Sequence, residues 1–106
     1  MDQDRFIKRL IELRIDKGVS ARDMSLSLGQ SAGYINNIEN GVSYPSMAVF
    51  FYICDFFGIT PKEFFDMDSH HPIEERTLLS TIKSLNYRQI EHLTAIAEDL
   101  GKTHEH

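Results

Sequence analysis

The chain has 106 residues, of which 42% are hydrophobic and 25% charged, a composition typical of one compact domain with a small appendage. It contains no apolar run long enough to cross a membrane. Its amino terminus is charged where a signal peptide would be apolar, so we expect a cytoplasmic protein. The single cysteine, Cys54, excludes an internal disulfide, and the net charge of −5 argues against bulk attraction to nucleic acid.

Gly and Pro residues separate segments whose apolar residues recur at helical spacing, and the sequence predicts no strands. The first predicted helix covers about residues 4–17 and ends at Gly18. Ser20 is placed to cap a second helix over residues 21–28, with Asp23 at the position of a capping-box partner. The inward face predicted for the first helix consists of Phe6, Leu10 and Leu13.

Three more short helices follow. Ser31 is predicted to cap a helix over residues 31–40, and Ser46 to cap another over residues 47–57, each ended by a glycine. A proline opens the fifth, residues 61–65, at the first helical position, where its missing N–H costs nothing. The sequence therefore predicts an all-α fold.

The helix expected over residues 47–57 has two apolar faces, which implies two neighbours. The inward face consists of Phe50, Ile53, Cys54 and Phe57, which makes the cysteine a buried packing thiol. The second face consists of Val49, Tyr52 and Phe56. Its neighbour is either the C-terminal part of the same chain or a second subunit.

Residues 67–72 are predicted to form a linker between a domain at residues 1–66 and a C-terminal helical hairpin with a tail at residues 73–106. Two apolar stripes identify the hairpin: Leu78, Ile82 and Leu85 in one helix, and Ile90, Leu93, Ala97 and Leu100 in the other. Asn86 is placed to cap the second of these helices. Because the hairpin is too small to form a core alone, it must dock, either on its own domain or in a homodimer.

Residues 10–65 resemble the Cro and phage-repressor helix-turn-helix family, of the XRE type. The motifs that match are "LIELR", "KGVSARDMSLSLG", "SAGYINNIENG", "YPS" and "FGITPKEFF". The resemblance implies a five-helix domain in which the third helix enters the major groove of DNA and the second lies over the backbone. It also implies that Arg14 and Glu39 form a structural ion pair. Glu39 is therefore expected to belong to the fold and not to a DNA contact.

Base reading needs no cation, because asparagine can pair with adenine through two hydrogen bonds. The polar side of the third helix carries Tyr34, Asn36, Asn37 and Asn40, preceded by Gln30, and the resemblance places Asn37 and Ala32 at reading positions. The helix ends at Ser20, Ser31 and Ser46, together with Arg22, Lys17 and the cluster Arg5, Lys8 and Arg9, are candidate phosphate contacts. For each asparagine, a solvated surface position or a role at the helix end is the alternative.

The sequence departs from the family at these same positions. Many relatives carry a glutamine where Ala21 stands, and cations where Ala32, Asn37, Asn40 and Val42 stand. The adjacent pair His70 and His71 lacks metal-ligand spacing, and no catalytic motif appears, so we expect no metal, no cofactor and no enzyme. The leading hypothesis is a transcriptional regulator that binds operator-like double-stranded DNA as a homodimer. The alternative is a protein-interaction module, or an antitoxin-like regulator that binds both DNA and a protein.

Overall fold

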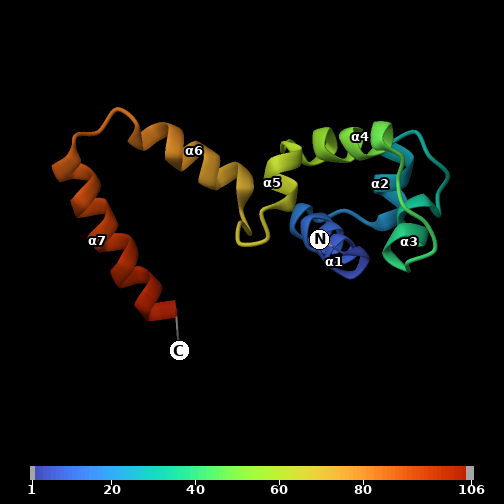
Figure 1. Ribbon diagram of the computed structural model, residues 1–106, viewed down its shortest axis with the longest axis horizontal. Coiled ribbons are helices and arrows are strands. Elements are labelled where there is room, and N and C mark those ends of the chain that lie inside the picture. Colours follow the sequence, from blue (N-terminus) through green and yellow to red (C-terminus); the bar gives the residue numbers. More distant parts are fainter. Residues whose placement is uncertain (1, 105–106) are drawn as a thin grey trace. The chain divides into compact units, whose positions relative to one another are not determined.

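The computed structural model describes residues 2–104, and within them the regular elements are all α-helices, without strands (Figure 1). Its seven helices are α1 (Gln3–Lys17), α2 (Ala21–Ser27), α3 (Tyr34–Glu39), α4 (Met47–Phe57), α5 (Pro61–Phe65), α6 (Pro72–Ile82) and α7 (Tyr87–His104). The last two residues of the expected C-terminal tail lie outside the described range. No helix in that range is both long and apolar enough to cross a membrane. The chain divides into two compact units, Met1–Ile73 and Glu74–His106.

Side-chain caps begin four helices of the first unit, α1, α2, α4 and α5, and glycines end α1 and α4. The side-chain oxygens of Asp2, Ser20, Ser46 and Thr60 each accept a hydrogen bond from the backbone N–H three residues further on. At α5 the bond is reciprocal, because the side chain of Glu63 accepts from the Thr60 N–H. Gly18 and Gly58 take the left-handed conformation that stops α1 and α4. These helix ends fall within a residue of their predicted places.

One apolar core fills the first unit. Its buried members are Phe6, Leu10, Leu13, Met24, Ile35, Ile38, Phe50, Ile53, Cys54, Phe57, Ile59 and Phe64. The inward faces predicted for the first and fourth helices are thereby confirmed. Cys54 is a packing residue, as expected, and burial raises the pKa of its thiol to about 11.

The second apolar face of α4 is partly covered within its own unit. Val49 and Phe56 pack against the core, and the Lys17 ammonium lies 4.8 Å from the centre of the Phe56 ring. Tyr52 remains 56% exposed. Val49 and Phe56 therefore have their neighbours within the first unit, and only Tyr52 is left for a neighbour outside it.

Arg9 joins α1 to α5 and to the segment that follows it. Its guanidinium is buried and donates to the carbonyl oxygens of Glu63, Phe64 and Ser69 at 2.8, 2.6 and 2.7 Å. The expectation that Arg9 adds surface charge for DNA was therefore wrong, because three carbonyl oxygens occupy its donors. The following segment is packed as well, since Ser69 is buried and His70 pairs with Glu12 at 2.7 Å.

The second unit consists of most of α6 and all of α7, connected by residues 83–86. Asn86 begins α7 as predicted, since its side chain accepts from the Gln89 N–H while the Gln89 side chain accepts from the Asn86 N–H. The larger apolar side chains of α7 are all exposed. The two helices therefore do not bury each other's apolar faces.

Candidate nucleic-acid interface

Ser25 fixes the joint between α2 and α3. Its hydroxyl donates to the Ala21 carbonyl oxygen at 2.7 Å and accepts from the Ile35 N–H at 2.9 Å, and the residue is fully buried. The Ile35 N–H belongs to the first turn of α3, where no intrahelical acceptor exists. A side chain of α2 thus satisfies the amino end of α3 and sets how the two helices meet.

The prediction that Ser31 caps the third helix was wrong, and so was the start of that helix. α3 begins at Tyr34, its N-cap is Gly33, and no side chain caps it there. Residues 31–33 form a turn in which the Ser31 carbonyl oxygen accepts from the Tyr34 N–H at 3.1 Å. The Ser25 hydroxyl already accepts a hydrogen bond from the first turn of α3. The Ser31 hydroxyl is therefore not required to cap that helix.

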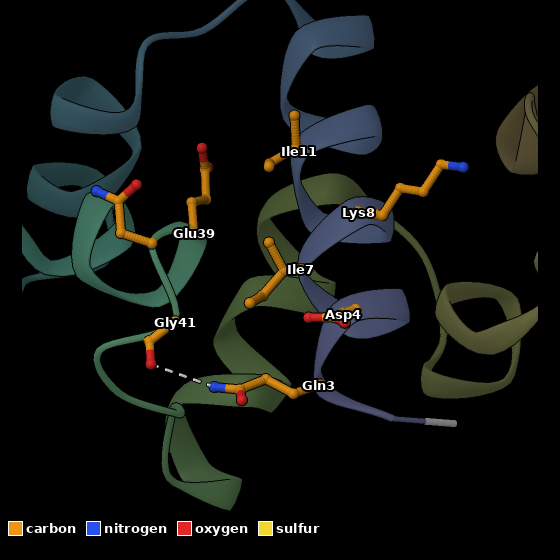
Figure 2. A pocket seen from close by; sticks show the side chains of 8 residues that line it. Gln3, Asp4, Ile7, Lys8, Ile11, Glu39 and Gly41 are labelled. Atoms are coloured by element: carbon orange, nitrogen blue, oxygen red, sulfur yellow. Dashed lines mark hydrogen bonds between the residues drawn. The ribbon is translucent and has the colours of Figure 1, made fainter.

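The carboxyl end of α3 is held by its own backbone and by α1. The Gly41 N–H donates to the Ile38 carbonyl oxygen, and the Val42 N–H donates to the Asn37 carbonyl oxygen. This is a Schellman motif, made possible by the positive φ of 76° at Gly41. The Gln3 side-chain amide donates to the Gly41 carbonyl oxygen at 3.3 Å (Figure 2).

An open groove of about 520 Å³ runs between α1 and this end of α3. Figure 2 shows Ile7 and Ile11 pointing from α1 toward α3, with Glu39 and Gly41 on the facing side. The groove borders the end of the candidate reading helix, and it leaves the Asn40 side chain exposed.

Arg14 and Glu39 form the ion pair that the resemblance implied. The Arg14 Nε and Nη2 atoms donate to the two carboxylate oxygens of Glu39 at 2.7 and 2.9 Å, and Nη1 donates to the Val19 carbonyl oxygen. The Arg14 and Glu39 side chains are 17% and 9% exposed. Hydrogen bonding to Glu39 raises the pKa of Arg14, and burial opposes this with a smaller effect. The one charge on α3 is therefore used to hold α3 against α1.

The predicted DNA-contacting residues lie on and around the exposed side of the α2–α3 unit. Ser20, Arg22, Ser31, Asn36, Asn37 and Asn40 are exposed, whereas Gln30, Ala32 and Tyr34 are partly buried. Burial raises the pKa of the Tyr34 hydroxyl. Within the described residues, the side-chain amides of Asn36, Asn37 and Asn40 make no hydrogen bond to the protein, so each is free to contact a ligand. Asn40 also occupies the C-cap of α3 through its backbone.

Positive charge is scarce around this surface. Residues 1–66 contain seven Lys and Arg, but Arg9 and Arg14 are committed to internal contacts. Residues 23–61, which include all of α3 and α4, contain no Lys or Arg. In the helix-turn-helix unit itself, the exposed cation is Arg22 in the first turn of α2. Phosphate binding at this surface therefore has to rest largely on uncharged donors.

Sequence reasoning missed the buried roles of two polar residues, Arg9 between α1 and α5 and Ser25 at the joint of α2 and α3, and both had a detectable signal. Arg9 stands three residues after Phe6 and directly before Leu10, on the inward stripe of α1. Ser25 stands directly after Met24, which is buried on the inward face of α2. A polar residue on an apolar stripe indicates a buried hydrogen-bond network, because an unpaired polar group there would be destabilising.

Comparison with known families decides the nature of this unit. The family model for a helix-turn-helix domain matches residues 7–67, more than half of the chain. The chain belongs to this helix-turn-helix family. The family is found in XRE-type regulators. The match runs from the first turns of α1 to just beyond α5 and leaves α6 and α7 outside. Searches of curated proteins and of solved structures find no significant match.

Membership in the helix-turn-helix family gives the α2–α3 unit a plain interpretation. In this motif the second helix of the unit is the one that lies in the major groove. Here that helix is α3, held at its amino end by Ser25 and at its carboxyl end by Arg14 and Gln3. The fold thus presents a fixed helix that carries asparagines on its exposed side.

Proposed function

We propose that this protein is a sequence-specific, DNA-binding transcriptional regulator of the XRE type, acting in the cytoplasm without catalytic activity. The exposed side of α3 reads base edges in the major groove through asparagine amides. The observation that carries this proposal is the combination of a rigidly held α3 with three unbonded asparagine side chains on a helix-turn-helix scaffold. An asparagine amide matches adenine, to which it can donate one hydrogen bond and from which it can accept another.

Pairing of two copies would compensate for the small number of cations on this surface. Each phosphate contact from a cation adds salt-dependent affinity, and one domain offers few of them. A homodimer places two α3 helices on successive major grooves, so two weak contacts act together on one operator-like site. The proposal therefore includes a homodimer.

One observation favours a second candidate, a protein-interaction module on the same fold or an antitoxin-like regulator that also binds a protein. Within the cation-free stretch of residues 23–61, the first unit exposes Val42, Tyr44, Met47 and Phe51. Exposed apolar groups of this kind commonly mark protein contacts. If the protein is an interaction module alone, it does not bind DNA.

Selection from a pool of random duplexes, at about 50 and 150 mM salt, distinguishes the two candidates. The proposal predicts enrichment of a motif containing A·T pairs at both salt concentrations. A matched variant carrying Asn36→Ala, Asn37→Ala and Asn40→Ala is expected to remain folded and to lose the motif. Absence of DNA retention by the wild-type protein at the lower salt would overturn the proposal and favour the interaction module.

A further inference from the structure

The side of α3 that faces away from the core is formed by amide side chains. Successive residues of a helix are about 100° apart around its axis, so Asn36, Asn37 and Asn40 fall within one arc of about 100°. Ile35 and Ile38 lie on the opposite side of the helix, and both are fully buried. The three asparagines therefore form one surface, the amide face, which is turned outward by the burial of the two isoleucines.

No charged side chain of α3 is available to read a base. Residues 23–61 contain no Lys or Arg, and both carboxylate oxygens of Glu39 are bonded to Arg14. Guanine presents two acceptors in the major groove and is read by Arg or Lys, whereas adenine presents one donor and one acceptor and is read by an amide. The amide face is therefore complementary to adenine and not to guanine.

An amide that reads adenine depends on the hydrogen at N6. The amide oxygen accepts from the exocyclic N6–H, and the amide nitrogen donates to N7. When N6 carries a methyl group, its remaining hydrogen is used in the pair with thymine, and the methyl group projects into the major groove. Methylation thus puts an apolar group in place of the donor that the amide oxygen needs, while the base sequence stays the same.

Two features of the structure keep α3 from adapting to such a methyl group. Asparagine carries its amide only one methylene from the backbone, so the side chain has little length with which to withdraw. The helix is held by Ser25 at its amino end and by Arg14 and Gln3 at its carboxyl end. A methyl group at N6 is therefore expected to remove the contact, because α3 is not free to shift around it.

We propose that the amide face distinguishes adenine from N6-methyladenine, so that methylation of the binding site releases the protein from DNA. The ligand is double-stranded DNA in which the adenines that contact α3 carry no methyl group at N6. The control acts on the DNA and requires no change in the protein. This inference rests on the proposed function, since it needs α3 to read adenine, and it adds the regulation of that same site.

Titration of duplexes that carry N6-methyladenine at single positions tests the proposal. The starting duplex is the motif selected by the wild-type protein, and each of its adenines is methylated in turn. We expect at least one methylated position to weaken wild-type binding by about tenfold or more. N6-methyladenine in the flanks outside the motif is the matched control and should leave the dissociation constant unchanged. Equal affinity for the unmethylated duplex and for every methylated one would overturn the proposal.

Single variants of the amide face show whether it senses the methyl group. At each sensitive adenine, one of Asn36→Ala, Asn37→Ala and Asn40→Ala is expected to bind the methylated and unmethylated duplexes equally, because it lacks the amide that contacts N6. These variants bind unmethylated DNA more weakly than wild type, so the ratio of the two dissociation constants is compared. Sensitivity that persists in all three variants would assign the effect to the shape of the DNA and overturn the proposal.

The inference and the proposed function fail in different ways. Selection that yields no motif, or a motif without adenine, would overturn adenine reading and this inference with it. Selective binding of unmethylated DNA without any effect of methylation would overturn the inference alone and leave the proposed function in place.

Discussion

Glu39 and Asn37 lie two residues apart on α3 and have different roles. Glu39 points to Arg14 and is mostly buried, whereas the Asn37 side chain is exposed and makes no hydrogen bond to the protein. Substituting one is expected to change stability and substituting the other to change selectivity. The two residues thus separate the role of α3 in the fold from its proposed role in reading DNA.

Glu39→Ala is expected to lower the free energy of unfolding by about 1.5–3 kcal/mol, because it leaves the partly buried Arg14 guanidinium without its two carboxylate acceptors. Glu39→Gln keeps one acceptor but removes the charge, and it is expected to lower the free energy of unfolding by less. Urea unfolding followed by circular dichroism measures both variants. An unchanged midpoint for Glu39→Ala would mean that the pair contributes nothing to stability.

Asn37→Ala is expected to leave the melting temperature unchanged and to relax base preference at one position of the selected motif. Loss of a bidentate contact to adenine removes about 1–3 kcal/mol of discrimination there. Competition binding against every single-base variant of the motif measures this loss. Lys62→Ala, on α5, is the control and should keep the wild-type preferences; identical preferences in Asn37→Ala would remove that residue from the readers.

Much of the first unit was predictable at the level of helices, because local signals suffice for them. The glycines at 18 and 58, the caps at Ser20, Ser46 and Thr60, and the inward stripes all act within a few residues of the helices that they define. The start of α3 was not predictable in this way. Its first turn is satisfied by Ser25, ten residues earlier, so the nearby Ser31 gave a false signal.

Ser25→Ala tests the joint between α2 and α3. The substitution leaves the buried Ile35 N–H without an acceptor, so we expect a loss of about 1–3 kcal/mol in the free energy of unfolding. Ser27→Ala, on the same helix but exposed, is the matched control and should lie within about 0.5 kcal/mol of wild type. Equal stability of the two variants would show that the Ser25 hydroxyl does not hold the helices together.

The molecule as a whole carries a net charge of −5, and its helix-turn-helix unit has one exposed cation, Arg22. The net charge and, through the family resemblance, the pairing of Arg14 with Glu39 were expected from the sequence. The internal contacts of Arg9 were not, since its carbonyl acceptors lie more than fifty residues away in the chain. DNA binding by this protein should therefore depend on salt less steeply than binding by a basic regulator.

Arg22→Ala is expected to reduce the slope of log K against log salt by about one for each subunit and to weaken binding similarly for all sequences. Lys62→Ala removes the same charge from α5, which Figure 1 shows at the other end of the first unit from α3, and should leave the slope unchanged. Titrations of one duplex at several salt concentrations give both slopes. Equal slopes for Arg22→Ala and wild type would exclude Arg22 from the phosphate contacts.

The central claim is that α3 reads adenine from the major groove, and a change in the DNA tests it most directly. Replacing single adenines of the selected duplex by 7-deazaadenine removes the N7 acceptor in the major groove and leaves the minor groove intact. The account predicts that at least one such replacement weakens wild-type binding by about fivefold or more, and that the same replacement has no effect on Asn37→Ala. Wild-type binding that is unchanged by every replacement would contradict it.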